Sequence, residues 1–251
     1  MSEREGLTTT KAAPGSGTWT RRSLLSWLGK GCVFSLAGGG VSGCLGSIAG
    51  EGRGKWTGCT RDGFAFSPGR CDFSGWGERT VDPQTLDNIL AGWRISVGGL
   101  VEEELTLPFD ELVALPSHNP VVDFHCVEGW SVFDVPWNGV HLSELFTRAQ
   151  VKPEATYVNF HTVGGSYNES LPLSVALEAN TILAYGIGGS SLSLKHGFPV
   201  RIVIPRLYGY KSAKFVDGIE LSDHPIEGYW VRWGYSYGGE VPPSRLRDGK
   251  Y

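Results

Sequence analysis

The chain has 251 residues, with 22 Lys and Arg against 26 Asp and Glu, which gives a net charge of −4. Its 36 glycines and 14 prolines argue against a long helical bundle and favour a loop-rich domain of strands and turns. The acidic balance argues against a nucleic-acid partner.

Residues 1–44 are a different kind of sequence from the rest. Arg21-Arg22 precede a weakly apolar, Gly-rich run at 31–43, which at 13 residues is shorter than the ~20 that span a bilayer. The pattern predicts a twin-arginine export signal, the route of proteins that leave the cytoplasm folded and often with a cofactor inserted. We therefore expect an exported protein, in the periplasm or cell envelope. An ordinary amphipathic N-terminal helix is the alternative.

The sequence offers two possible cleavage sites at the end of this signal and does not decide between them. Val41-Ser42-Gly43-Cys44 resembles a lipobox, in which an acylated Cys44 would anchor the domain to a membrane. Ser47-Ile48-Ala49 offers a competing cleavage site. Without residues 1–43, which hold five Lys/Arg and two Asp/Glu, 17 basic residues face 24 acidic ones, a net charge of −7.

Residues 45–90 are rich in Gly, Ser and Trp without a clear period, and we interpret them as an irregular extension. Outside the cytoplasm Cys59 and Cys71 could form a disulfide, which would contribute ~3 kcal/mol. Cys126 is then the odd cysteine, and an unpaired thiol in an oxidising compartment needs burial or a function.

Residues 91–251 read as an α+β domain with a mixed sheet, short helices and long loops, whose site lies in loops at strand ends. A turn is expected at Asn138-Gly139. In the strand near 201, Arg201 and Val203 should share one face, which lets Arg201 leave the core. The strands are expected at 93–97, 121–126, 155–163, 181–185, 200–205 and 215–221, and the short helices at 108–115, 140–146 and near 172.

Cys126 ends an apolar strand and is followed by Gly129 and Trp130. A lone thiolate at a strand end is a soft metal ligand or a nucleophile. A cationic cluster later in the chain suggests a specific anionic ligand, because it stands out on an acidic protein. Its members, all within 195–214, are Lys195, Arg201, Arg206, Lys211 and Lys214.

Four motifs occur together in one order: 126–131 (CVEGWS), 196–201 (HGFPVR), 208–212 (YGYKS) with Lys214, and 228–230 (GYW). Together they resemble the molybdopterin-binding domain of the sulfite oxidase family, especially the catalytic subunit of bacterial periplasmic methionine-sulfoxide reductases. The resemblance covers about residues 93–236. It implies the mixed-sheet fold of that family and a molybdenum–molybdopterin cofactor.

The resemblance also implies roles for individual residues. Cys126 should ligate the metal and be the catalytic residue, since a soft thiolate completes the sulfur ligands of the pterin. The turn at 209–212 should offer backbone amides and a hydroxyl to the phosphate tail. Relatives supply an Asn- and aromatic-containing loop before the first strand, and residues 45–90 show no counterpart. The expected cofactor contacts are Thr162, His196, Arg201, Gly209, Tyr210, Lys211, Ser212 and Lys214.

The implied reaction is a two-electron oxygen-atom transfer on a small-molecule substrate. Sulfite-oxidising members place an arginine soon after the ligand cysteine, whereas this chain has Glu128 there, which favours a neutral sulfoxide. The chain has no C-x-x-C-H haem site and no second hydrophobic span, so we expect a separate haem or quinol-linked electron-transfer partner. We expect a monomer.

Two other functions are weighed. A cofactor-free cysteine hydrolase would pair Cys126 with His161 or His196, but it leaves the cationic cluster unexplained. A surface-anchored binding module that has lost its cofactor would explain neither Cys126 nor the cluster.

Overall fold

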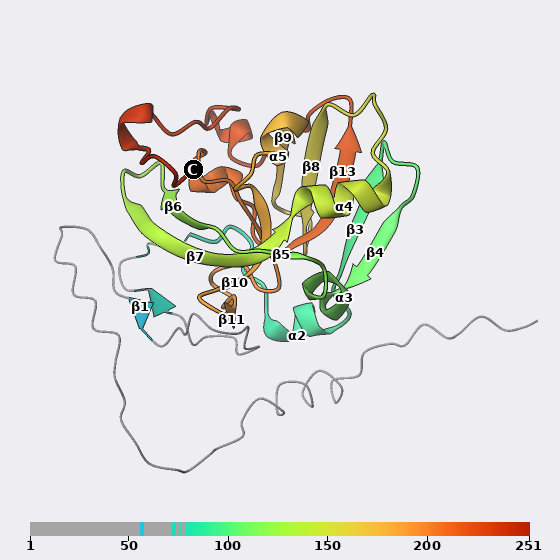
Figure 1. The fold of residues 1–251 in the computed structure, drawn as a ribbon, viewed down its shortest axis with the longest axis horizontal. Coiled ribbons are helices and arrows are strands. Elements are labelled where there is room, and N and C mark those ends of the chain that lie inside the picture. The colour runs from blue at the N-terminus through green and yellow to red at the C-terminus, as the bar shows by residue number, and fades with distance from the viewer. Residues whose placement is uncertain (1–55, 58–71, 74–75, 77–78) are drawn as a thin grey trace, which may run out of the picture.

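The computed structural model describes residues 56–57, 72–73, 76 and 79–251 (Figure 1). The expected export signal, Cys44 and the Cys59–Cys71 pair lie outside these residues. Within the described part of the chain, no helix is both long and apolar enough to cross a bilayer.

The elements alternate between strands and short helices, as the sequence predicts. The strands are β1 (Trp56–Thr57), β2 (Asp72–Phe73), β3 (Arg94–Gly99), β4 (Leu105–Pro108), β5 (Ser117–His118), β6 (Val121–His125), β7 (Ser131–His141), β8 (Tyr157–Thr162), β9 (Asn168–Pro172), β10 (Ile182–Ile187), β11 (Ser190–Ser191), β12 (Arg201–Val203) and β13 (Val216–Ser222). The helices are α2 (Leu86–Leu90), α3 (Phe109–Val113), α4 (Leu142–Ala149) and α5 (Leu173–Ala176), with single 3-10 turns η1 (Gly209–Lys211), η2 (Val231–Trp233) and η3 (Pro243–Arg245).

One of the two larger sheets in the described residues has five strands in the order β4-β3-β13-β8-β9. The β13–β3 pair is parallel and its other pairs are antiparallel, so the sheet is mixed. In β3 the side chains alternate, with Ile95 and Val97 buried and Arg94 and Ser96 exposed, as expected for a strand with one covered face. The predicted mixed-sheet α+β fold is confirmed.

The second sheet holds the strands that lead to Cys126. Within the described residues it has six strands, with β11-β10-β7-β5 in order, β12 paired with β10, and β6 paired with β7. The long, curved strand β7 runs from the left edge to the centre of the molecule in Figure 1, with β6 beside it. Because β6 and β7 form a hairpin, the loop that joins them, residues 126–130, lies at one end of this sheet.

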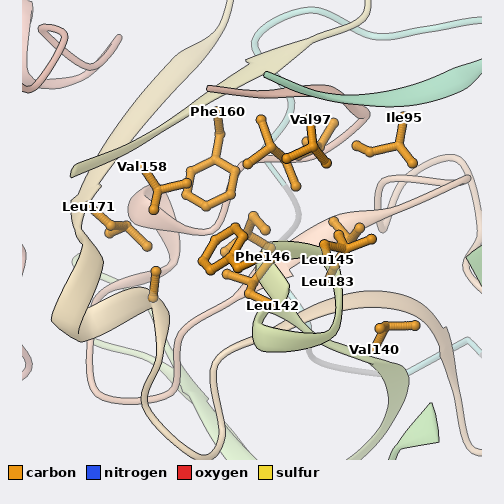
Figure 2. Packing of buried hydrophobic residues seen from close by; sticks show 14 of the residues in the cluster. Ile95, Val97, Val140, Leu142, Leu145, Phe146, Val158, Phe160, Leu171 and Leu183 are labelled. Carbon is orange, nitrogen blue, oxygen red and sulfur yellow. The ribbon is translucent and has the colours of Figure 1, made fainter. Parts of the chain in front are cut away.

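Helix α4 joins the two sheets through the larger core. Its first turn is closed by Ser143 N–H, which donates to Nδ1 of His141 at 3.2 Å. Its buried side chains, Leu142, Leu145, Phe146 and Ala149, follow the i, i+3, i+4, i+7 spacing of one helix face. Figure 2 shows this face turned toward side chains of β3, β8 and β9, including Val97, Val158, Phe160 and Leu171.

A second core lies on the other side of β12. Val200, Ile202 and Ile204 belong to the larger core, whereas Val203 packs in the second core with Phe124 and Trp137. The predicted alternation of this strand is therefore confirmed. Arg201, however, does not leave the core: only 1% of it is exposed, because its guanidinium lies against the rings of the second core.

The turn predicted at Asn138-Gly139 is wrong, since both residues lie inside β7. A Cβ on Gly139 would lie 2.6 Å from the carbonyl oxygen of Leu183, so the glycine permits close strand contact. Asn138 accepts a hydrogen bond from Gly189 N–H at 2.7 Å, which ties β7 to the β10–β11 turn. β4, β7 and β9 lie outside the strands predicted from the sequence, and β9 (NESLP) lacks an apolar alternation.

Candidate active site

Cys126 lies directly after β6, at the start of the thiol loop, which we define as residues 126–131. Gly129 N–H donates to the carbonyl of Cys126 at 3.1 Å, and Cys126 N–H donates to the carbonyl of Trp130 at 2.9 Å. Gly129 has φ +101°, a left-handed conformation that glycine adopts without strain. The loop is thus a closed turn that holds the thiol at the strand end.

The thiol borders a cavity of about 370 Å³. Its walls come from the residues before α2, the end of β6 with the thiol loop, the ends of β8 and β12, the loop between β8 and β9, and the segments that follow β12 and β13. The lining residues are Trp76, Arg79, Thr80, Val81, Asp82, Phe124, Cys126, Val127, Glu128, Trp130, Thr162, Tyr167, Arg201, Gly209, Tyr210, Ser212, Lys214, Phe215, Trp230 and Tyr235.

A carboxylate accompanies the thiol. Sγ of Cys126 lies 4.0 Å from Oε2 of Glu128, which also accepts a hydrogen bond from Nε1 of Trp130 at 3.1 Å. Arg79 donates to the other carboxylate oxygen at 3.2 Å. These bonds from Trp130 and Arg79 hold the pKa of Glu128 below its usual value. Burial raises the pKa of the Cys126 thiol, and a bound metal ion would reverse this, because a coordinating thiol is deprotonated.

Arg201 forms a fixed cation in the cavity wall. Its guanidinium donates to the carbonyls of His196 at 3.3 Å and Ser212 at 3.1 Å. It also lies 5.0 Å from the centroid of the Phe124 ring and 5.5 Å from that of Trp137. These contacts fix its position, so it can present positive charge to a ligand without reorganisation.

Ser212 and Lys214 contribute polar groups from the segment after η1. The buried hydroxyl of Ser212 has no hydrogen-bond partner within the described residues, and Ser212 lines the cavity. Nζ of Lys214 donates to the carbonyls of Arg79 and Lys195, at 2.9 and 2.6 Å, and to the hydroxyl of Thr80 at 3.0 Å. The turn supplies a hydroxyl as expected, but the amides of Lys211 and Ser212 bond inside the turn, to Tyr208 and Gly209.

Two expected cofactor contacts do not line the cavity. One of them, His196, is 2% exposed, and its Nδ1 lies 2.9 Å from the hydroxyl of Ser193. Its ring packs edge-on against Trp76, with centroids 4.6 Å apart. Burial, helped by the charges of Arg201, Lys214 and Lys195, lowers the pKa of His196 to about 3. His196 is therefore a neutral side chain behind the wall, and its carbonyl supports Arg201.

Lys211 is the second expected cofactor contact that does not line the cavity. Its ammonium lies 2.5 Å from Oε1 of Glu169 and 2.9 Å from the carbonyl of Ser170. The two charged side chains are 1% and 0% exposed. Burial lowers the pKa of Lys211 and raises that of Glu169, and their mutual attraction opposes both shifts. The structure makes this lysine an internal tie between η1 and β9 rather than a point charge for a phosphate.

One wall of the cavity was not predicted from the sequence. Trp76 and residues 79–82 line the cavity, although residues 45–90 showed no recognisable upstream loop. The ring of Trp76 contacts those of Phe124 and Trp137, at 5.0 and 5.8 Å between centroids. A tryptophan between glycines in an irregular extension was the available signal. Lys214 fastens this segment to the domain through Arg79 and Thr80.

The chemistry of the cavity fits a molybdenum cofactor. Cys126 offers a soft sulfur to the metal, and Arg201, Lys214 and the hydroxyl of Ser212 offer positive charge and a hydrogen bond to an anionic tail. Thr162, Gly209 and Tyr210 also line the cavity, as the resemblance implied.

The cysteine hydrolase gains no support from this geometry. Nε2 of His161 lies 3.1 Å from a carboxylate oxygen of Glu220, on the exposed face of the five-stranded sheet. His196 is held by Ser193. The raised pKa of Cys126 is also opposite to the shift that activates a nucleophile.

Comparison with known proteins gives a consistent result. The family model described as the oxidoreductase molybdopterin binding domain matches residues 82–230. An uncharacterized oxidoreductase, YuiH of Bacillus subtilis, is 40% identical over 148 residues, which are 59% of this chain and 74% of that protein. The protein-methionine-sulfoxide reductase catalytic subunit MsrP of Campylobacter jejuni is 30% identical over 171 residues, which are 61% of this chain and 57% of that protein.

A solved structure has a similar fold. The sulfane dehydrogenase SoxCD of Paracoccus pantotrophus superposes with a TM-score of 0.56 at 24% identity, over 66% of this chain and 46% of that chain. The chain thus matches less than two thirds of the length of the methionine-sulfoxide reductase subunits and of this structure.

Proposed function

The chain belongs to the oxidoreductase molybdopterin binding domain family, and from this premise we propose that it is an exported molybdenum enzyme that reduces sulfoxides rather than oxidising sulfite. The family membership makes it a molybdopterin-dependent oxidoreductase domain. Its similarity to methionine-sulfoxide reductase catalytic subunits supports sulfoxide reduction. The substrate, the direction of the reaction, the exported location and the electron-transfer partner are the proposed parts.

The carboxylate of Glu128 beside the thiol is the observation that favours a neutral substrate over a dianion. Glu128 lies 4.0 Å from Sγ of Cys126 and is held there by Trp130 and Arg79. A dianion such as sulfite would approach this negative charge, whereas a neutral sulfoxide would not be repelled. For a dianion ~6 Å from one carboxylate in a water-like dielectric the repulsion from that carboxylate is ~1.4 kcal/mol, about tenfold in binding. The guanidinium of Arg79, 3.2 Å from the same carboxylate, opposes it, so this is an upper bound for the wild type.

The proposed reaction converts a sulfoxide, two electrons and two protons into a sulfide and water. The bound cofactor supplies the oxygen-atom transfer and the two-electron redox change. The chain provides Cys126 as metal ligand, Arg201 and Lys214 as charges that hold the anionic tail, and the aromatic rings of Trp130 and Trp230 as walls that limit water. The electrons come from a separate haem or quinol-linked protein.

The test compares two reactions of the cofactor-loaded protein. Methionine sulfoxide is reduced with a chemically reduced viologen dye, and sulfite is oxidised with ferricyanide. We expect kcat/KM for the sulfoxide to exceed that for sulfite at least tenfold. Glu128→Gln keeps the shape and removes the charge, so it should raise kcat/KM for sulfite up to about tenfold.

Glu102→Gln is the matched control, because Glu102 pairs with Lys152 at 3.9 Å and does not line the cavity. It should leave both reactions unchanged. A wild-type protein that oxidises sulfite faster than it reduces the sulfoxide would contradict the proposal. So would a Glu128→Gln variant in which the sulfite reaction stays the same.

A further inference from the structure

The C-terminal strap, which we define as residues 241–250, crosses the β6–β7 hairpin and reaches the thiol loop. It follows the end of the family match at residue 230. Val241 N–H donates to the carbonyl of Arg206 at 3.0 Å at one end of the strap. At the other end Asp123 N–H donates to the carbonyl of Lys250, also at 3.0 Å.

A charged cluster fastens the second half of the strap. Arg247 donates two hydrogen bonds to the carboxylate of Asp123, one of them at 2.6 Å, and also contacts Asp134 at 3.0 Å. Asp123 is fully buried in β6, three residues before the thiol. Lys250 contacts Asp134 at 2.8 Å. The strap is therefore anchored on both sides of Arg245.

Arg245 lies between these anchors and binds the thiol loop. Its guanidinium donates to the carbonyls of Cys126 at 3.4 Å, Gly129 at 3.2 Å and Trp130 at 3.1 Å, and to the hydroxyl of Ser131 at 2.9 Å. All four acceptors belong to the six-residue thiol loop. The guanidinium also lies 5.6 Å from the ring centroid of Tyr208, in the segment that leads into η1.

We propose that Arg245 is a positioning residue that fixes the orientation of the Cys126 thiol through the backbone of the thiol loop. The loop's own two hydrogen bonds use the carbonyls of Cys126 and Trp130 and leave that of Gly129 to an outside donor, which is Arg245. A guanidinium has five N–H donors in a rigid fork. Nη1 of Arg245 reaches the carbonyl of Cys126, and Nη2 reaches the carbonyls of Gly129 and Trp130 and the hydroxyl of Ser131, with one of its two N–H groups shared between two acceptors. An ammonium at the same place would act as a point charge and could not keep this geometry.

The inference rests on the proposed function only in taking Cys126 as the ligand of the metal. It does not depend on which substrate is turned over. Because the contacts of Arg245 are with backbone oxygens and Ser131, its removal should turn the sulfur relative to its strand without removing a ligand. Small errors in the placement of reacting groups are sufficient to slow an enzymatic reaction strongly.

The experiment compares Arg245→Gln and Arg245→Lys with the wild type in the full, cofactor-loaded protein. The readouts are the molybdenum content, the sulfur-to-molybdenum charge-transfer absorption and the electron paramagnetic resonance spectrum of the partly reduced protein. We expect both variants to bind molybdenum, both spectra to shift, and kcat to fall at least tenfold with KM changed less than threefold. Arg148→Gln removes a surface guanidinium from the end of α4 and should change none of these.

Arg245→Lys separates positioning from charge and keeps the test decisive where Arg245→Gln folds poorly. A lysine variant with wild-type spectra and kcat would overturn the proposal, since charge alone would then suffice. Unchanged spectra in Arg245→Gln would overturn it as well. Failure of the proposed function is distinguishable, because it would appear as wild-type protein that does not reduce sulfoxides, whatever the spectra of the Arg245 variants.

Discussion

The buried ion pair of Lys211 and Glu169 makes the sharpest stability prediction. In the wild type, Ser170 N–H donates a hydrogen bond to the carboxylate of Glu169 at 2.8 Å. Glu169→Gln keeps an oxygen that can accept this bond but removes the negative charge opposite Lys211. Because the side chains are 1% and 0% exposed, the remaining ammonium has no access to bulk water. Breaking a buried pair in this way costs about 3–5 kcal/mol. With a urea m-value of ~2 kcal/mol/M, the unfolding midpoint should fall by about 2 M.

The assay is urea unfolding of proteins with equal cofactor content, since a bound cofactor adds to apparent stability. The double variant Glu169→Gln/Lys211→Met removes both charges, and we expect it to recover most of the loss. The coupling free energy of the cycle should then be at least about 2 kcal/mol, because the recovered loss is part of it and the cost of Lys211→Met alone adds to it. A loss below ~1 kcal/mol in Glu169→Gln would refute the assignment of Lys211 as an internal tie and would favour its role as a cofactor contact.

His196 should make the protein acid-sensitive, because the folded imidazole has a pKa of about 3 and the unfolded one takes up a proton below about 6.5. Between pH 6.5 and 5 the wild type should lose about 1.6 kcal/mol more unfolding free energy than His196→Asn in urea unfolding, and equal losses would contradict the predicted shift. Gly209→Ala should lower stability by about 1–3 kcal/mol and reduce the molybdenum content, because the new Cβ would lie 2.7 Å from Cε1 of Phe124 in the cavity wall. An alanine variant with normal molybdenum content would show that the wall can adjust.

The sequence predicts the fold well where periodicity is simple. The alternation around Arg201 leads to the observed strand because its two faces meet two different cores. The apolar run before Cys126 leads to β6, in which Val122 and Phe124 pack in the second core. The predicted turn at Asn138-Gly139 fails because the same pair of residues can also serve a close contact between strands. Nothing local distinguishes these two uses of glycine.

The sequence predicts which motifs form the site. It does not predict which charged side chains face the cavity and which pair inside the protein. Lys211 reads as an available cation, but its partner Glu169 is 42 residues away in a strand without an apolar pattern. Trp76 and Arg79 precede the first predicted strand and have no period that would place them at the cavity. Arg245 lies 119 residues after Cys126, and only the folded chain brings its guanidinium to the thiol loop.

The central claim is that the sulfur of Cys126 binds molybdenum. The most direct measurement is elemental analysis and the visible absorption spectrum of the purified protein beside its Cys126→Ser variant. We predict that the wild type contains molybdenum with a sulfur-to-metal absorption band, and that the serine variant loses this band and most of the metal. Equal molybdenum and identical spectra in the two proteins would contradict the account.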